Sequence, residues 1–167
     1  IDDQIKSSKI QFFNVSHQRY LKRLDQVKSF YPSLLNQVFD FNIDEKINLD
    51  FKNSTYSKSL SELKKQWRKF LKFNALGIYS NLKDVENKKK EKNPEYSLRS
   101  DSDLEIETRE VLKEDMKYFF EARYDLNRND YFSIYVNSIA LQFDPHTSYF
   151  APSAKDRFDQ NISGKFE

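Results

Sequence analysis

The 167-residue sequence contains no cysteine, only two glycines and only four prolines. Without cysteine the chain can form no disulfide, no thiolate metal site and no thiol nucleophile. The scarcity of glycine argues against a β-sandwich, a barrel or a glycine-loop nucleotide site, because those structures need residues that tolerate positive φ at many turns. We therefore predict a mostly helical chain.

Long apolar runs are also missing, since no stretch approaches the length of a signal-peptide core or a membrane span. We expect no membrane span in this segment. Hydrophobic residues make up 38% of the chain, charged residues 32% and aromatic residues 16%, which predicts a solvated surface around an aromatic-rich core. The chain starts on Ile1, and residues 163–167 resemble the beginning of an extended segment, so we expect a piece of a longer protein.

Apolar residues recur at helical spacing in five stretches. We predict helices over residues 4–31, 60–78, 103–120, 130–143 and 153–162. Pro32 should end the first helix, Ser59 or Ser61 should cap the second, and Asn129 or Asp130 should cap the fourth. The fourth is apolar around most of its circumference, so we expect it at the centre of the fold.

Two stretches lack the helical period. Residues 33–58 are expected to form an irregular connection, and residues 81–102, which include the run Lys88–Lys92, are expected to form a mobile loop. The predicted fold class is all-α: an irregular bundle of four to five helices with one long irregular connection and a truncated C-terminal strand.

The most distinctive string follows the fourth helix and brings an acid, an imidazole and two hydroxyls within five positions. It consists of Asp144, Pro145, His146, Thr147, Ser148 and Tyr149. These groups could supply a nucleophile, a base and an orienting carboxylate. However, triad members seldom lie so close in sequence, and Asp-Pro followed by Thr and Ser is typical of a tight turn. We predict a structural turn and no catalytic residue.

The remaining polar groups suggest neither a metal site nor a cofactor site. His17 has no second histidine at ligand spacing, so we expect a packed side chain. The Glu-x-x-His element of a di-metal bundle is absent. Five acidic residues follow one another on the third helix beside Arg109, Lys113 and Lys117, and we expect them to form a solvated face with i,i+4 ion pairs. They are Glu105, Glu107, Glu110, Glu114 and Asp115.

Charge is distributed unevenly, with a net charge of about +8 in residues 1–100 and about −6 in residues 101–167. Basic residues cluster in 64–72 and 88–92, which could attract nucleic acid. The aromatic residues are needed on helical stripes, and no glycine-rich or zinc-binding recognition element is present, so we expect no nucleic-acid partner. A stand-alone helical protein-interaction module with a basic surface stays open as an alternative.

Residues 138–152, with the sequence SIALQFDPHTSYFAP, resemble the segment that precedes the PDZ domain in tail-specific, C-terminal processing serine proteases. In that family a DPHT-(S/N)-Y string is followed by a short helix and the first PDZ strand. Residues 63–76, with Trp67 and the run KFNAL, resemble the family's Leu-x-x-x-Trp and Lys-Phe-(Asp/Asn)-x-Leu region. The resemblance covers residues 55–167.

This resemblance implies a helical N-terminal domain over residues 1–162 and the start of a truncated PDZ domain over residues 163–167. The parent protein would be a bacterial serine-type endopeptidase that uses a Ser/Lys dyad, without a cofactor or metal, to cut proteins near their C-termini. The dyad would lie beyond this chain, which would act as a scaffold for the PDZ and protease domains. Implied partners are proteins with exposed C-termini and an adaptor, and the implied location is the periplasm or cell envelope.

Overall fold

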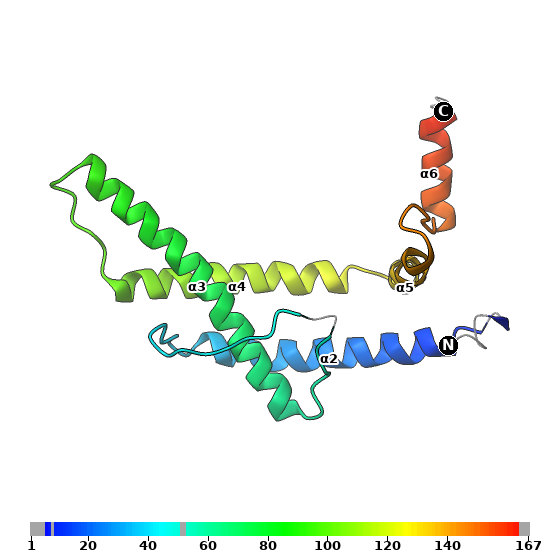
Figure 1. The fold of residues 1–167 in the computed structure, drawn as a ribbon, viewed down its shortest axis with the longest axis horizontal. Coiled ribbons are helices and arrows are strands. Elements are labelled where there is room, and N and C mark those ends of the chain that lie inside the picture. The colour runs from blue at the N-terminus through cyan, green and yellow to red at the C-terminus, as the bar shows by residue number, and fades with distance from the viewer. Residues whose placement is uncertain (1–5, 8, 51–52, 164–167) are drawn as a thin grey trace. The chain divides into compact units, whose positions relative to one another are not determined.

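A computed structural model of the chain describes residues 6–7, 9–50 and 53–163. Within these residues it contains five α-helices (Figure 1), which confirms the all-α class. They are α2 (Gln11–Leu35), α3 (Leu60–Lys92), α4 (Asp101–Tyr124), α5 (Arg128–Phe143) and α6 (Pro152–Ser163). None of these helices is both long and apolar enough to cross a membrane. The expected C-terminal strand falls on Ser163, the last residue of α6, and on 164–167, which lie outside the described residues.

The chain divides into two compact units. Residues 1–20 and 122–167 form the first unit, and residues 21–121 form the second. In the second unit α2, α3 and α4 enclose a hydrophobic core that includes the fully buried Leu35 and Leu71. Aromatic rings complete it, with Tyr31 stacked on Phe120 at 4.9 Å between ring centroids. The expected aromatic contribution to the core is therefore present.

The C-terminal end of α2 lies beyond the predicted stop at Pro32. The helix continues through that proline to Leu35, and the amide of Asn36 still donates to the carbonyl of Pro32 at 3.1 Å. A proline inside a helix removes one backbone hydrogen bond. Leu35 is fully buried in the core, and the burial of a leucine side chain is worth about 1.5–3 kcal/mol, which offsets that loss.

The start of α3 was predicted correctly, but its end was not. Ser59 caps the helix by accepting from the amide of Glu62 at 3.1 Å, and Glu62 in turn accepts from the amide of Lys58 at 2.7 Å. The helix then runs to Lys92, so most of the loop predicted for residues 81–102 is helical. Lysine and glutamate are good helix formers, and basic residues in a last turn favour the helix dipole. Only residues 93–100 connect α3 to α4.

In the first unit, the N-terminal part of α2 packs against α5 through aromatic side chains. Phe13 is buried, and its ring lies 5.2 Å from Phe132 and 5.4 Å from Tyr135. His17 is half-buried and stacks on Phe13, as expected for a packed histidine. The ring of Tyr131 lies 4.8 Å from His17, and burial raises the pKa of Tyr131 to about 12. These rings hold the unit together.

The position predicted for α5 was wrong in two respects. Its cap is Asn127, which accepts from the amides of Asn129 and Asp130, while Asp130 accepts from the amide of Asn127. None of its residues is fully buried, so α5 is not a central helix. Its apolar circumference needs neighbours on every side, yet several of its apolar side chains stay exposed, with Phe143 at 86%.

Candidate functional site

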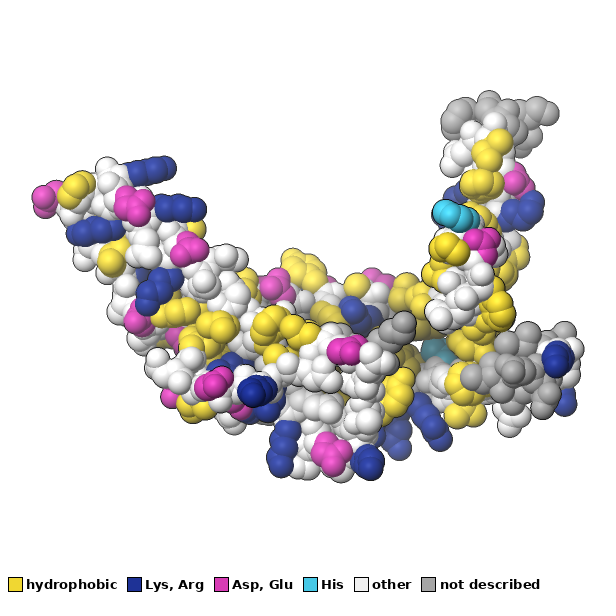
Figure 2. Space-filling model, in the orientation of Figure 1, with side chains coloured by type: hydrophobic (Ala, Val, Ile, Leu, Met, Phe, Trp, Pro, Cys, Tyr) yellow, Lys and Arg dark blue, Asp and Glu magenta, His cyan; other side chains and the backbone are white. Residues whose placement is uncertain are grey.

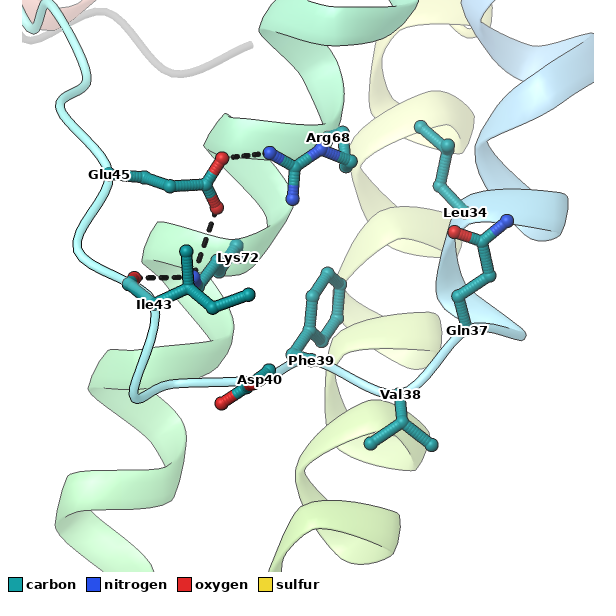
Figure 3. Close-up of a pocket in the computed structure, with 9 residues that line it drawn as sticks. All are labelled: Leu34, Gln37, Val38, Phe39, Asp40, Ile43, Glu45, Arg68 and Lys72. Carbon is teal, nitrogen blue, oxygen red and sulfur yellow. Dashed lines mark hydrogen bonds and ion pairs between the residues drawn. The ribbon is translucent and has the colours of Figure 1, made fainter.

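The carboxylate of Glu45 fastens the irregular connection between α2 and α3 to α3. Glu45 accepts from Arg68 and, at 3.0 Å, from Lys72, and Lys72 also donates to the carbonyl of Ile43 at 2.9 Å (Figure 3). Lys72 is buried. The hydrogen bond from Arg68, followed by that from Lys72, lowers the pKa of Glu45 to about 2. Two residues of the predicted basic cluster therefore hold the fold together.

Three hollows lie where this connection crosses α3. The smallest, about 130 Å³, is the one drawn in Figure 3 beside Phe39 and Glu45. Two larger hollows, of about 310 and 350 Å³, flank the segment at Lys46 and Ile47, and Lys69 borders both. The ammonium of Lys69 donates to the carbonyl of Lys46 at 3.0 Å. These volumes suit a small ligand or a few side chains of a partner.

The connection between α3 and α4 is held by a second carboxylate that sequence reasoning missed. Glu86 is buried and accepts from the ammonium of Lys89 and the hydroxyl of Tyr96, both at 2.8 Å. The amide of Arg99 also donates to it, at 3.3 Å. These hydrogen bonds lower the pKa of Glu86 to about 2. The bond from Lys89 contributes most, and the bonds from Tyr96 and Arg99 add to it. The cluster fastens residues 93–100 to the end of α3.

A third buried carboxylate corrects the prediction of a solvated acidic face on α4. Glu105 is buried, accepts from the amide of Phe39 at 3.0 Å and pairs with Arg109 at 2.9 Å. It thus fixes the start of the long connection to α4. The other predicted members are on the surface, where Glu110 pairs with Lys113 and Glu114 with Lys117 at i,i+3 spacing.

The Asp144–Tyr149 string forms a closed hydrogen-bonded turn after α5. The Asp144 carboxylate accepts from the hydroxyl of Thr147 at 2.6 Å and from the amide of His146 at 2.9 Å, and these two bonds lower its pKa. The amide of Thr147 donates to the carbonyl of Asp144 at 3.1 Å. Asp144 thus contacts the backbone of His146 and not its ring, unlike the acid–imidazole–hydroxyl order of a catalytic triad.

Asn137 on α5 fastens the end of this turn and was not singled out from the sequence. Its side-chain oxygen accepts from the amide of Tyr149 at 2.7 Å, and its amide nitrogen donates to the carbonyl of Tyr149 at 3.1 Å. The ring of Tyr149 also lies edge-on to Phe132 at 6.1 Å. A polar residue between the apolar residues Val136 and Ile139 of α5 was the only sequence signal for this contact.

Large apolar side chains of α5, of α6 and of the segment between them remain exposed. Phe143 is 86% exposed, Ile134 56% and Ile162 70%. Phe150 and Phe158 stack on each other at 5.0 Å, yet each is 45% exposed. Figure 2 shows hydrophobic side chains gathered on the visible face of α5 and α6. Such a concentration of exposed apolar surface usually marks a contact with another protein surface.

The helices and the hydrogen-bonded turn after α5 describe an all-α domain with exposed apolar side chains on α5 and α6. The sequence matches the family described as "Tail specific protease N-terminal domain" over residues 1–153. The chain belongs to this family, so its parent is a protease. No solved protein structure matches the chain.

Proposed function

We propose that this chain is the non-catalytic N-terminal scaffold of a periplasmic serine-type endopeptidase that processes proteins from their C-termini. Family membership supports the coarser statement, a region of a tail-specific protease. In this proposal residues 1–162 form the scaffold, residues 163–167 begin a PDZ domain, and a Ser/Lys dyad belongs to the protease domain. The scaffold holds these domains in position and offers a surface to substrate or adaptor.

The uncovered apolar face of α5 and α6 is the observation that carries the proposal. The 16-residue α5 has no fully buried residue, and Phe143 is 86% exposed. Leaving this apolar surface in water costs free energy. The exposed residues of this face belong to the helices before and after the Asp144–Tyr149 turn. Contact with a following domain would remove this apolar surface from water.

The turn supplies the geometry that such a scaffold needs. Asn137 fastens Tyr149 to α5 from one side, and Asp144 closes the turn from the other. Both links are short and local, so the direction in which the chain leaves α5 is fixed by α5 itself. In the proposal this turn, Asp144–Tyr149, sets the orientation of the next domain and takes no part in the chemistry.

Expression of this 167-residue chain, followed by an assay on an unstructured protein substrate, tests the non-catalytic role. We expect no turnover, and measurable turnover would refute the assignment of the dyad to another domain. The scaffold role is tested with Phe143→Ser in the parent protease. We expect lower proteolysis and a lower melting temperature of the parent, with no change in the melting temperature of this chain alone.

Val38→Ser is the matched control, because Val38 is 71% exposed but lies in the connection after α2, far along the chain from α5. It should leave both proteins unchanged. Equal effects of the two substitutions on the parent would count against a specific role of the α5 face.

The alternative, a stand-alone module with a basic surface, has less support from the geometry. Arg68 and Lys72 are engaged by Glu45, and the visible end of α3 carries acidic and basic side chains side by side (Figure 2). The sequence of the parent gene beyond Glu167 discriminates between the two proposals. A PDZ domain with a downstream Ser/Lys dyad supports the scaffold, and a stop codon supports the module.

A further inference from the structure

The largest of the three hollows combines an aromatic floor with basic edges. It measures about 350 Å³ and lies between residues 46–48 and 54–55 of the connection on one side and α3 on the other. Trp67 and Phe70 line it from α3, and their rings pack edge-to-face at 5.4 Å between centroids. Both rings are half-buried, so part of each faces the hollow. An apolar side chain entering there would find a preformed surface.

The charged side chains that line this hollow are all positive. Its lining includes Lys46 and Lys69 and no acidic side chain. Lys69 donates to the carbonyl of Lys46, and an ammonium has three donors, so others remain. Within the described part of the chain neither lysine has a carboxylate partner, because the nearby Glu45 is taken up by Arg68 and Lys72. The hollow is complementary to an anion.

The connection also offers main-chain hydrogen-bonding groups along the same hollow. Residues 44–50 have no regular secondary structure, and residues 44–49 make no backbone–backbone hydrogen bond to any described residue. Ile47 and Asn48 line the hollow together with the two lysines, so their main-chain amides are candidate donors to a ligand there. Extended peptides and terminal carboxylates are recognised by such free main-chain groups.

We propose that this hollow binds the free C-terminus of a polypeptide. The terminal carboxylate lies beside Lys46 and Lys69 and accepts from the neighbouring main-chain amides, and the last apolar side chain packs on Trp67 and Phe70. The inference rests on the proposed function, because a protease that processes proteins from their C-termini meets such ends as substrates. It adds a substrate-docking site on the helical domain.

Trp67 is the only tryptophan of the chain, so its fluorescence reports directly on this hollow. The probe is a short N-acetylated peptide ending in Ala-Leu with a free carboxylate, and the matched probe is the same peptide with a C-terminal amide. We expect a saturable change in tryptophan emission with the acid. The amide should bind about five- to ten-fold more weakly, because it loses charge-assisted hydrogen bonds.

Two lysine variants distinguish binding at this hollow from a general attraction between basic side chains and an anionic peptide. Lys46→Gln removes an exposed charge that has no partner in the described chain, and we expect it to weaken acid binding several-fold without changing the melting temperature. Lys65→Gln removes the same charge from an exposed position of α3 that does not line the hollow, and it should leave binding unchanged. Equal binding of acid and amide, or equal effects of the two variants, would overturn the site. Neither result bears on the scaffold role, which the Phe143→Ser experiment tests separately.

Discussion

Replacement of Asn137 by alanine tests whether α5 fixes the turn that follows it. The substitution removes two hydrogen bonds to the backbone of Tyr149, of 2.7 and 3.1 Å, in a half-buried place. At about 1 kcal/mol for each bond, the turn should lose about 2 kcal/mol of local stability. Alanine is a better helix former than asparagine by about 0.5 kcal/mol, so global unfolding would underestimate the loss.

Amide hydrogen exchange at Tyr149 is therefore the right measurement, because that amide donates directly to Asn137. We expect its protection to fall by about thirty-fold, which corresponds to about 2 kcal/mol in the opening equilibrium. Ser138→Ala is the control, since its hydroxyl donates only to the carbonyl of Tyr135 within α5. Unchanged protection of Tyr149 in Asn137→Ala, or an equal loss in Ser138→Ala, would refute the reasoning.

Two further predictions concern the second unit. Leu71→Ala should lower the free energy of unfolding by about 3 kcal/mol in a urea titration, because Leu71 is fully buried, whereas Leu76→Ala, at a position 45% exposed, should cost less than half as much. An equal loss would mean that the core is not centred on Leu71. Glu86 has a folded-state pKa of about 2, below its ordinary 4.5, so its contribution is complete above pH 4.5 and disappears as the pH falls towards 2. The stability difference between the wild type and Glu86→Gln should therefore shrink over that range; a pH-independent difference would contradict the lowered pKa.

The features that the sequence predicted correctly depend on neighbouring residues. Ser59 with Glu62 forms a cap within four positions, and Asp144 with Pro145 ends α5 within two. Apolar residues at helical spacing predict the core for the same reason, because the residues that form each stripe are only three or four positions apart.

The features that the sequence missed depend on contacts between distant residues. Glu45 meets Arg68 and Lys72 from more than twenty positions away, and Glu105 meets the amide of Phe39 across 66 positions. A buried carboxylate with several donors is indistinguishable in sequence from an exposed one. For this reason the charged stretch that contains Glu86 resembled a loop, although its carboxylate fastens residues 93–100 to the helix.

The error at α5 has a different origin and bears on function. An apolar circumference indicates that a helix buries most of its surface, but it does not indicate which molecule covers that surface. Within the described chain α5 is covered in part, by Phe13 of α2 and by Tyr149 after the turn, and Phe143 and Ile134 stay exposed. A helix of this composition is stable in solution only when a further surface packs on it or when the exposed area is tolerated at a cost. If Phe143→Ser destabilises the parent protease and not this chain alone, the first explanation holds, and the pattern that suggested a central helix will have identified an interface between domains.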